Sequence, residues 1–146
     1  LTLTQKLRMS GAVIVTTPQD IALADVRKGA DMFRKVNTPV LGVIENMSGL
    51  VIEGAVDGGI SSITINGENI EVDSSGKFRF KMDLFKTGGG KKESERLGVP
   101  LLGKIPISTE IMSATDAGVP LTQKDPDSPL GQIYLNIARD LMSSLD

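Results

Sequence analysis

Three short apolar runs, separated by segments of other character, constrain the fold of this chain more than any other feature. They cover residues 11–17, 40–44 and 100–106, consist mostly of Val, Ile, Leu, Ala and Gly, and are bounded by turn signals. A strand that is apolar along its whole length is typical of a parallel sheet that helices cover on both faces. We therefore predict an α/β fold with a mostly parallel sheet flanked by helices.

The segments that follow the first and third runs, and the C-terminal segment, carry the apolar spacing of helices. The first helix is predicted to begin at Pro18 and to run to about Val36. A short helix is expected after residues 88–90. Four residues are predicted to mark helix ends: Thr17, Ser108 and Ser128 as N-caps, and Gly98 as a stop.

The segment at about 52–82 has strand signals of another kind. Residues 66–67 are Asn-Gly between two β-branched runs, which predicts a hairpin with a primed turn. Residues 77–82 alternate strictly, with Phe78, Phe80 and Met82 on one face and three cations, predicted to be solvated, on the other. We expect a small three-stranded antiparallel meander inserted into the α/β domain. Whether its Phe side chains pack on that domain or contact a second subunit or a client stays open.

Composition excludes several kinds of chemistry. The chain has no Cys and no His, so thiolate sites, disulfides and the commonest general base are absent. A net charge of −2 gives no basic field for nucleic acid, and no apolar run is long enough to span a membrane. A cytoplasmic protein is predicted. Asp20, Asp25 and Glu45 are interpreted as surface or capping residues, and no catalytic residue or metal ligand is nominated.

Three stretches of the chain, in order, resemble the second half of the Mrp family of P-loop ATPases. These proteins are relatives of MinD and ParA and are implicated in carrying iron–sulfur clusters. The stretches are Val15-Thr-Thr-Pro-Gln-Asp-Ile-Ala-Leu-Ala-Asp-Val-Arg-Lys28, Gly42-Val-Ile-Glu-Asn-Met-Ser48 and Leu97-Gly-Val-Pro-Leu-Leu-Gly-Lys-Ile-Pro106. The resemblance implies that residues 1–146 form the C-terminal half of an ATPase domain, which binds ATP and Mg²⁺ and acts as a homodimer when intact.

The phosphate-binding loop of that family is missing from this chain. No G-x-x-x-x-G-K-[ST] motif occurs, and Gly88-Gly-Gly-Lys-Lys92 fails because no Ser or Thr follows the Lys. The resemblance also places the Asp that positions Mg²⁺ upstream of Leu1. We therefore expect an excised piece of an ATPase that has no turnover by itself.

Part of an adenine site is predicted instead. Asn46 follows a buried strand, where open α/β sheets bind ligands, and its amide matches the N6/N7 edge of adenine. The resemblance assigns that role to Asn46 and places the backbone of Pro106 and Ile107 beside the base. The alternative is that Asn46 only caps the turn into Ser48-Gly49.

The C-x-x-C pair that binds an iron–sulfur cluster in the family is also absent. Its place holds Val51 and the insert, so this chain is not expected to ligate a cluster. An alternative function is a non-catalytic interaction module whose β insert recognises a protein partner. A positioning ATPase is disfavoured, because Arg139 is the only cation after Lys124.

Overall fold

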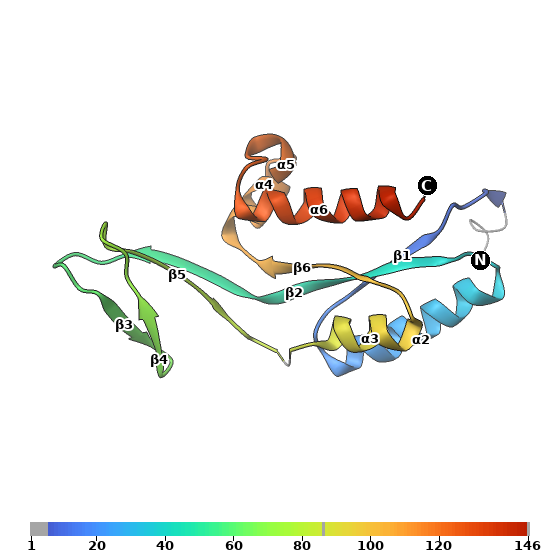
Figure 1. The fold of residues 1–146 in the computed structure, drawn as a ribbon, viewed down its shortest axis with the longest axis horizontal. Helices are drawn as coiled ribbons and strands as arrows, with labels where there is room; N and C mark the ends of the chain where they lie inside the picture. The colour runs from blue at the N-terminus through green and yellow to red at the C-terminus, as the bar shows by residue number, and fades with distance from the viewer. Residues whose placement is uncertain (1–5, 86, 146) are drawn as a thin grey trace.

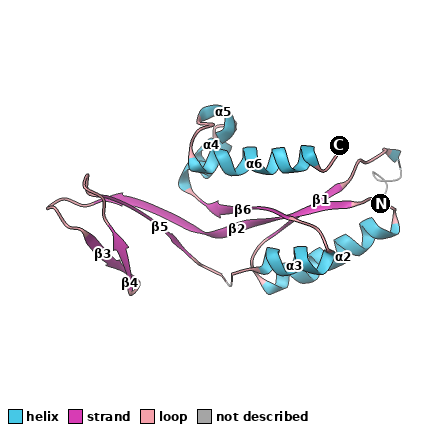
Figure 2. Cartoon of the chain, in the orientation of Figure 1, coloured by secondary structure: helices cyan, strands magenta, loops and turns pink. Residues whose placement is uncertain are grey.

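The computed structural model describes residues 6–85 and 87–145 and confirms the α/β fold (Figure 1). Helices α4, α5 and α6 lie on one side of a mixed sheet, and helices α2 and α3 lie on the other (Figure 2). The elements are β1 (Ala12–Thr16), α2 (Asp20–Lys35), β2 (Val40–Ala55), β3 (Ser62–Ile65), β4 (Glu68–Glu71), β5 (Lys77–Met82), α3 (Gly89–Leu97), β6 (Leu101–Ile107), α4 (Thr109–Asp116), α5 (Leu121–Lys124) and α6 (Pro129–Ser143).

Strand β2 is the centre of the sheet. Its first half runs parallel to β1 on one side and to β6 on the other, with Val13 opposite Gly42 and Val43 opposite Leu101. The three apolar runs therefore share one sheet, as the sequence predicts. Strand β2 is also longer than predicted, because it continues to Ala55.

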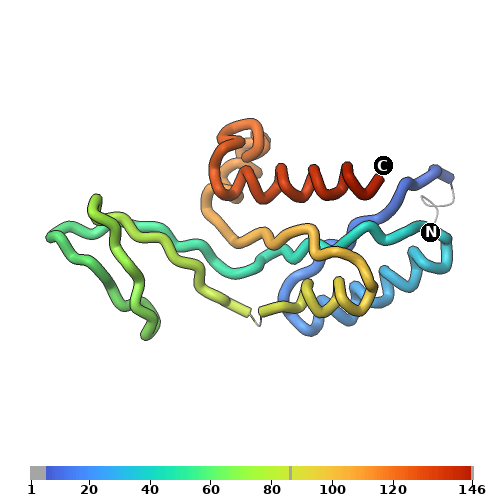
Figure 3. The backbone as a smooth tube through the Cα atoms, in the orientation of Figure 1, coloured from blue at the N-terminus to red at the C-terminus, as the bar shows by residue number. Residues whose placement is uncertain are grey.

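The second half of β2 leaves the helices and pairs with β5. Between the halves, Met47 and Gly49 have positive φ angles of 54° and 82°, and the pairing with β6 is irregular. Beyond them, residues 50–55 run antiparallel to β5. We call residues 50–82 the arm and the remaining described residues the body. Figure 3 shows the arm projecting from the body, with the β3–β4 hairpin at its far end.

The predicted β3–β4 hairpin is confirmed, but the predicted three-stranded meander is wrong. Strands β3 and β4 form a two-stranded sheet of their own, and β5 joins the central sheet through β2. The reason is that residues 50–55 of β2 offer β5 an unbroken run of six partners, from Leu50 opposite Met82 to Ala55 opposite Lys77. The extent of the insertion, about 52–82, stays a prediction.

Three of the four predicted helix ends are confirmed. Ser108 and Ser128 each accept a hydrogen bond from a backbone N–H of the helix that they begin, at 3.1 Å and 3.0 Å. Gly98 ends α3 with a positive φ of 67°.

The predicted cap at Thr17 is wrong. Helix α2 begins at Asp20, after Gln19, whose side chain makes no capping hydrogen bond. The Thr17 hydroxyl is buried and has no hydrogen-bond partner within the described part of the chain. The next residue, Pro18, packs against α3, because a Cβ on Gly89 would lie 2.8 Å from the carbonyl oxygen of Pro18.

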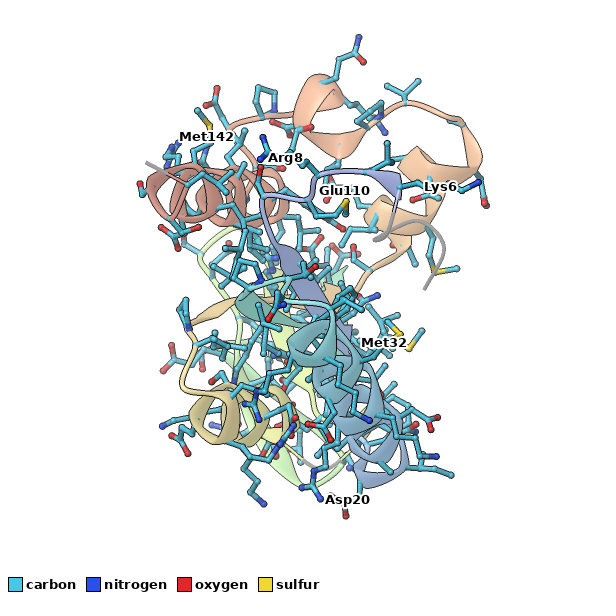
Figure 4. All side chains as sticks on the ribbon, turned by 90° about the vertical axis from the view of Figure 1, so that its right-hand side faces the viewer. Lys6, Arg8, Asp20, Met32, Glu110 and Met142 are labelled. Atoms are coloured by element: carbon cyan, nitrogen blue, oxygen red, sulfur yellow. The ribbon has the colours of Figure 1, made fainter. Side chains whose placement is uncertain are left out.

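Two apolar clusters form the core of the body. Ile14, Ala30 and Val43 form the cluster between the sheet and α2. Ala114, Leu121 and Leu130 form a second cluster among α4, α5 and α6. Figure 4 shows the two layers from the end of the molecule, with Glu110 and Met142 on one side and Asp20 on the other. Within the described part of the chain, no helix is long and apolar enough to cross a membrane.

Candidate functional site

The predicted base-binding residues lie together at the carboxyl ends of two neighbouring parallel strands. Asn46 on β2 is opposite Ile105 on β6, and Leu50 is opposite Ile107. Pro106, between these two β6 residues, is buried, whereas Asn46 and Ile107 are half-buried. This is the edge at which open α/β sheets bind ligands. The structure brings the three residues together, and their roles in binding stay a prediction.

The amide of Asn46 already makes one local contact. Its Oδ1 accepts a hydrogen bond of 2.9 Å from the backbone N–H of Met47, which has a positive φ. Asn46 therefore does cap the turn that follows it, as the alternative interpretation predicts, but this uses only one of the interactions that its amide can make. A carbonyl oxygen has two lone pairs, so Oδ1 can accept a second hydrogen bond while Nδ2 donates. Asn46 thus retains the paired donor and acceptor that an adenine edge requires.

Glu45, the residue before Asn46, is buried, with only 1% of its surface exposed. Its Oε2 accepts a hydrogen bond of 2.6 Å from the backbone N–H of Gly90, at the start of α3. Its Oε1 accepts one of 2.8 Å from the Ser48 hydroxyl. A carboxylate at a helix N-terminus is favoured by the helix dipole and by the unpaired N–H groups there. The sequence predicts Glu45 to be either a surface or a capping residue. The capping interpretation is confirmed, and the surface interpretation is wrong.

Contact with Glu45 explains the triglycine before α3. A Cβ on Gly90 would lie 2.7 Å from the Cβ of Glu45, so only glycine allows the helix to approach the strand this closely. Because the Glu45 carboxylate occupies the start of α3, that helix end does not fit a phosphate group. The triglycine is therefore a packing feature of the body.

The hydrogen bonds of Glu45 continue into the arm. Lys81 of β5 donates from Nζ to the Ser48 hydroxyl at 3.3 Å, and that hydroxyl donates in turn to Glu45. On the same strand, Arg79 pairs with Glu53 at 3.0 Å. The three β5 cations are exposed, as predicted, but two of them also have partners in the fold. Strand pairing, which the sequence did not reveal, places Lys81 within reach of Ser48.

A second buried carboxylate, Glu93, joins the two helices below the sheet. Its Oε1 accepts hydrogen bonds from the guanidinium of Arg96, and its Oε2 lies 3.6 Å from Nε of Arg27 on α2. The hydrogen bond to Glu93 raises the pKa of Arg96 above its ordinary value. This cluster is saturated by its own partners, and we assign it to helix packing.

The remaining acidic residues are the next candidates for a metal-binding or acid–base site. Residues 6–85 and 87–145 contain no cluster of three or more Asp and Glu side chains able to hold a metal ion, and the sequence has no Cys or His. Asp20 lies exposed in the first turn of α2, and Asp25 is exposed and 3.7 Å from Lys28. The surface interpretation of these two residues is confirmed.

Comparison with known proteins identifies the family. A family model described as NUBPL iron-transfer P-loop NTPase, of the ParA group, matches residues 1–58 and 59–142. The chain belongs to this family. The match includes both β2 and β6, the strands that carry Asn46 and Pro106.

Relatives in the family are named for iron–sulfur clusters. An iron–sulfur cluster carrier protein from Pseudomonas fragi is 43% identical over 138 residues, which are 94% of this chain and 40% of the relative. The iron–sulfur cluster transfer protein NUBPL from Mus musculus is 37% identical over 145 residues, 99% of this chain and 38% of the relative. The chain therefore spans about two fifths of the length of the curated relatives it matches.

Solved structures of the cell division ATPase MinD share the fold. The protein from Pyrococcus furiosus has a TM-score of 0.58 and 19% sequence identity, over 92% of this chain and 43% of that one. MinD from Aquifex aeolicus has a TM-score of 0.55 and 17% identity. At such identities the likeness concerns the fold alone, and it agrees with the α/β sheet described above.

Proposed function

We propose that this chain supplies the base-binding side of a nucleotide-dependent P-loop ATPase that serves iron–sulfur cluster transfer. The observation that carries the proposal is the placement of Asn46 beside Ile105 and Pro106, at the carboxyl edge of β2 and β6. The edge offers an amide donor and acceptor next to a buried, apolar neighbour. This combination suits one edge and one face of a purine.

The described residues fit the base better than the triphosphate. The one helix start that the sequence offered for phosphate, at residues 88–90, is occupied by the Glu45 carboxylate. The triphosphate and Mg²⁺ would therefore be held by groups outside this chain, and bound Mg²⁺ would supply charge neutralisation there. Asn46, Pro106 and Ile107 would orient the base, and we assign them no step in hydrolysis.

The free edge of β1, within residues 6–85 and 87–145, supports the proposal that another structural element pairs with this strand in the intact protein. In the described part of the chain, β1 pairs with β2 and with no other strand. Val15 on this strand is 58% exposed, and Ile21 at the start of α2 is 78% exposed. Large apolar residues at an unpaired strand edge are typical of a surface that another element covers. We propose that a phosphate-binding unit pairs with this edge.

The iron–sulfur cluster is the cargo of the proposed function, and this chain would not ligate it. Cluster ligation uses thiolates, and the sequence contains no Cys. We therefore propose that the nucleotide-dependent part of carrier function resides here and that the thiolates come from elsewhere in the assembly.

Titration with adenosine and with MgATP tests the proposal. We expect the purified chain to bind both weakly and with similar affinity, because only the base is recognised, and to release no phosphate from ATP. The backbone amide resonances of Asn46, Met47, Ile105 and Ile107 should shift, whereas Pro106 has no backbone N–H to report. Asn46→Ala should remove the response, while Asn69→Ala, an exposed Asn in the arm, should leave it unchanged.

Two results would contradict the proposal. If ATP bound about a hundredfold more tightly than adenosine, a difference of about 2.7 kcal/mol, the chain would itself contact the phosphates. If Asn69→Ala weakened binding as much as Asn46→Ala, the base would not lie at the predicted edge.

A further inference from the structure

A groove of about 370 Å³ lies where the arm meets the body. Its apolar lining includes Phe80 from the arm, Pro106 from β6, and Leu130 and Ile133 from the first turns of α6. A groove of this size is at the lower end of the range that admits a ligand group. One bulky apolar side chain, or a short stretch of peptide, is the scale of occupant that it fits.

The charged residues of this groove are all cations. Arg79, Lys81 and Lys104 line it, and none of its described lining residues is acidic. Arg79 has a counterion in Glu53, and Lys81 donates to Ser48. Lys104 is exposed and has no ion pair with a carboxylate among the described residues. Since the chain as a whole carries a net charge of −2, this groove is a local basic patch on an acidic protein.

The apolar lining and the positive charge of the groove together indicate which class of ligand it can bind. An apolar centre with a polar, charged rim is the usual anatomy of a protein–protein contact site. Three cations are too few for a nucleic acid tract, and a small inorganic anion would leave the apolar lining unused. Strand addition at β5 is disfavoured, because its alternate residues are exposed Lys and Arg, which protect a sheet edge.

We propose that this groove binds a short acidic segment of a partner protein, with an apolar side chain seated among Phe80, Leu130 and Ile133. Carboxylates on the segment face Lys104 and the two arm cations. The groove shares only Pro106 with the proposed base site, because neither Asn46 nor Ile107 lines it. The binding needs no nucleotide, so the site goes beyond the nucleotide function. It gives the arm a role in recognising a partner by charge and shape.

Fluorescence anisotropy with a defined peptide tests this proposal. The probe is a short fluorescein-labelled peptide with Leu and Phe at its centre and two Glu on each side. Matched peptides carry Lys in place of Glu, or Ser in place of Leu and Phe. We expect the acidic apolar peptide alone to bind the full chain, and the affinity to fall as salt is raised.

Two charge reversals locate the binding. Lys104→Glu should weaken peptide binding about tenfold, whereas Lys92→Glu, at another exposed cation, on α3, should leave the affinity unchanged. Lys104→Arg should retain binding, because the charge is kept. Circular dichroism of each variant confirms that its fold is intact.

Four outcomes would overturn the proposal. They are equal binding of the Lys-substituted peptide, equal loss in Lys104→Glu and Lys92→Glu, displacement of the peptide by adenosine, and no anisotropy change up to about 1 mM peptide. Displacement by adenosine would assign the groove to the base. The proposed nucleotide function would survive the other three, so the two proposals fail separately.

Discussion

The body and the arm share strand β2, but different interactions hold each of them. In the body, Val43 on β2 is fully buried among α2, α3 and the neighbouring strands. In the arm, the same strand has β5 along one edge, and Phe78 and Phe80 remain half-buried. Two-sided burial therefore stabilises one half of β2, and cross-strand pairing stabilises the other.

This difference implies that the body is more stable than the arm. A two-stranded ribbon is marginally stable by itself in water, so the arm depends on its attachment to the body. The Phe78 ring lies across Gly54, where a Cβ would meet it at 2.6 Å, and this contact packs β5 against β2 at that point. We expect the arm to open more easily than the body, and changes in the body to cost more.

The largest expected effect is at Glu45, where the body would lose its buried carboxylate. Glu45→Ala leaves the buried N–H of Gly90 without an acceptor and should lower the free energy of unfolding by about 3 kcal/mol. Urea denaturation measures the loss. Glu95→Ala, an exposed acid on the same α3 helix, is the control and should change it by less than about 0.5 kcal/mol. Equal effects would contradict the assigned role of Glu45.

A glycine pair provides the next comparison. Gly90→Ala places a methyl group against Glu45 and should destabilise the chain by about 2 kcal/mol. Gly29→Ala, on α2, meets no atom within 4 Å and should stabilise it by about 0.5 kcal/mol through helix propensity. Thermal denaturation of both variants is the measurement. A neutral Gly90→Ala would show that α3 can move away from β2 at no cost.

Replacing the end of the arm should have a smaller effect. Ala55 and Lys77 are cross-strand partners, so a two-residue Asn-Gly turn can replace residues 56–76 and close the ribbon. We expect the free energy of unfolding of the body to change by less than about 1 kcal/mol. Titration with adenosine and MgATP should give the same affinities as for the unaltered chain. Cooperative loss of the body on this change would show that body and arm form one folding unit.

The smallest expected effect is at Asp73, in the turn before β5. Its carboxylate accepts hydrogen bonds from the hydroxyl and N–H of Ser75 and the N–H of Lys77, and these bonds hold its pKa below the ordinary 3.8. A lowered pKa means that the carboxylate stabilises the turn above pH 3.8 and loses this effect as pH falls through the lower, folded value.

Amide hydrogen exchange near residues 73–77 should therefore rise on acidification, and Asp73→Asn should raise it at neutral pH. Glu68→Gln, at an exposed acid of the β3–β4 hairpin, is the control and should leave this exchange unchanged. Exchange in the body should stay the same in both variants. An Asp73→Asn chain with unaltered exchange would show that the turn is held by its backbone alone.

The body was predictable from the sequence because each of its strands carries its own signal. The runs at residues 11–17, 40–44 and 100–106 are apolar on both faces, and this pattern fixes burial before any partner is known. The hairpin at residues 66–67 was predictable for a similar reason, since Asn-Gly specifies its turn locally. The edge that brings Asn46 near Pro106 followed from the parallel order of those strands.

The features that sequence reasoning missed depend on contacts between distant segments. Glu45 is buried because α3, whose start lies more than forty residues away, brings its N–H groups to the strand. The only signal in the sequence was the pair Gly89 and Gly90, which allows such an approach. The pairing of β5 with β2 was hidden because the apolar run ends at Ile44, although the chain continues as a strand to Ala55.

The irregular stretch in the middle of β2 changes the course of the strand. From Asn46 to Leu50 the strand advances by four residues, while its partner advances by two, from Ile105 to Ile107. The two extra residues on β2 form a bulge, in which Met47 and Gly49 have positive φ angles. Because a bulge bends its strand and increases the local twist, this stretch is where β2 turns away from β6 and becomes the partner of β5.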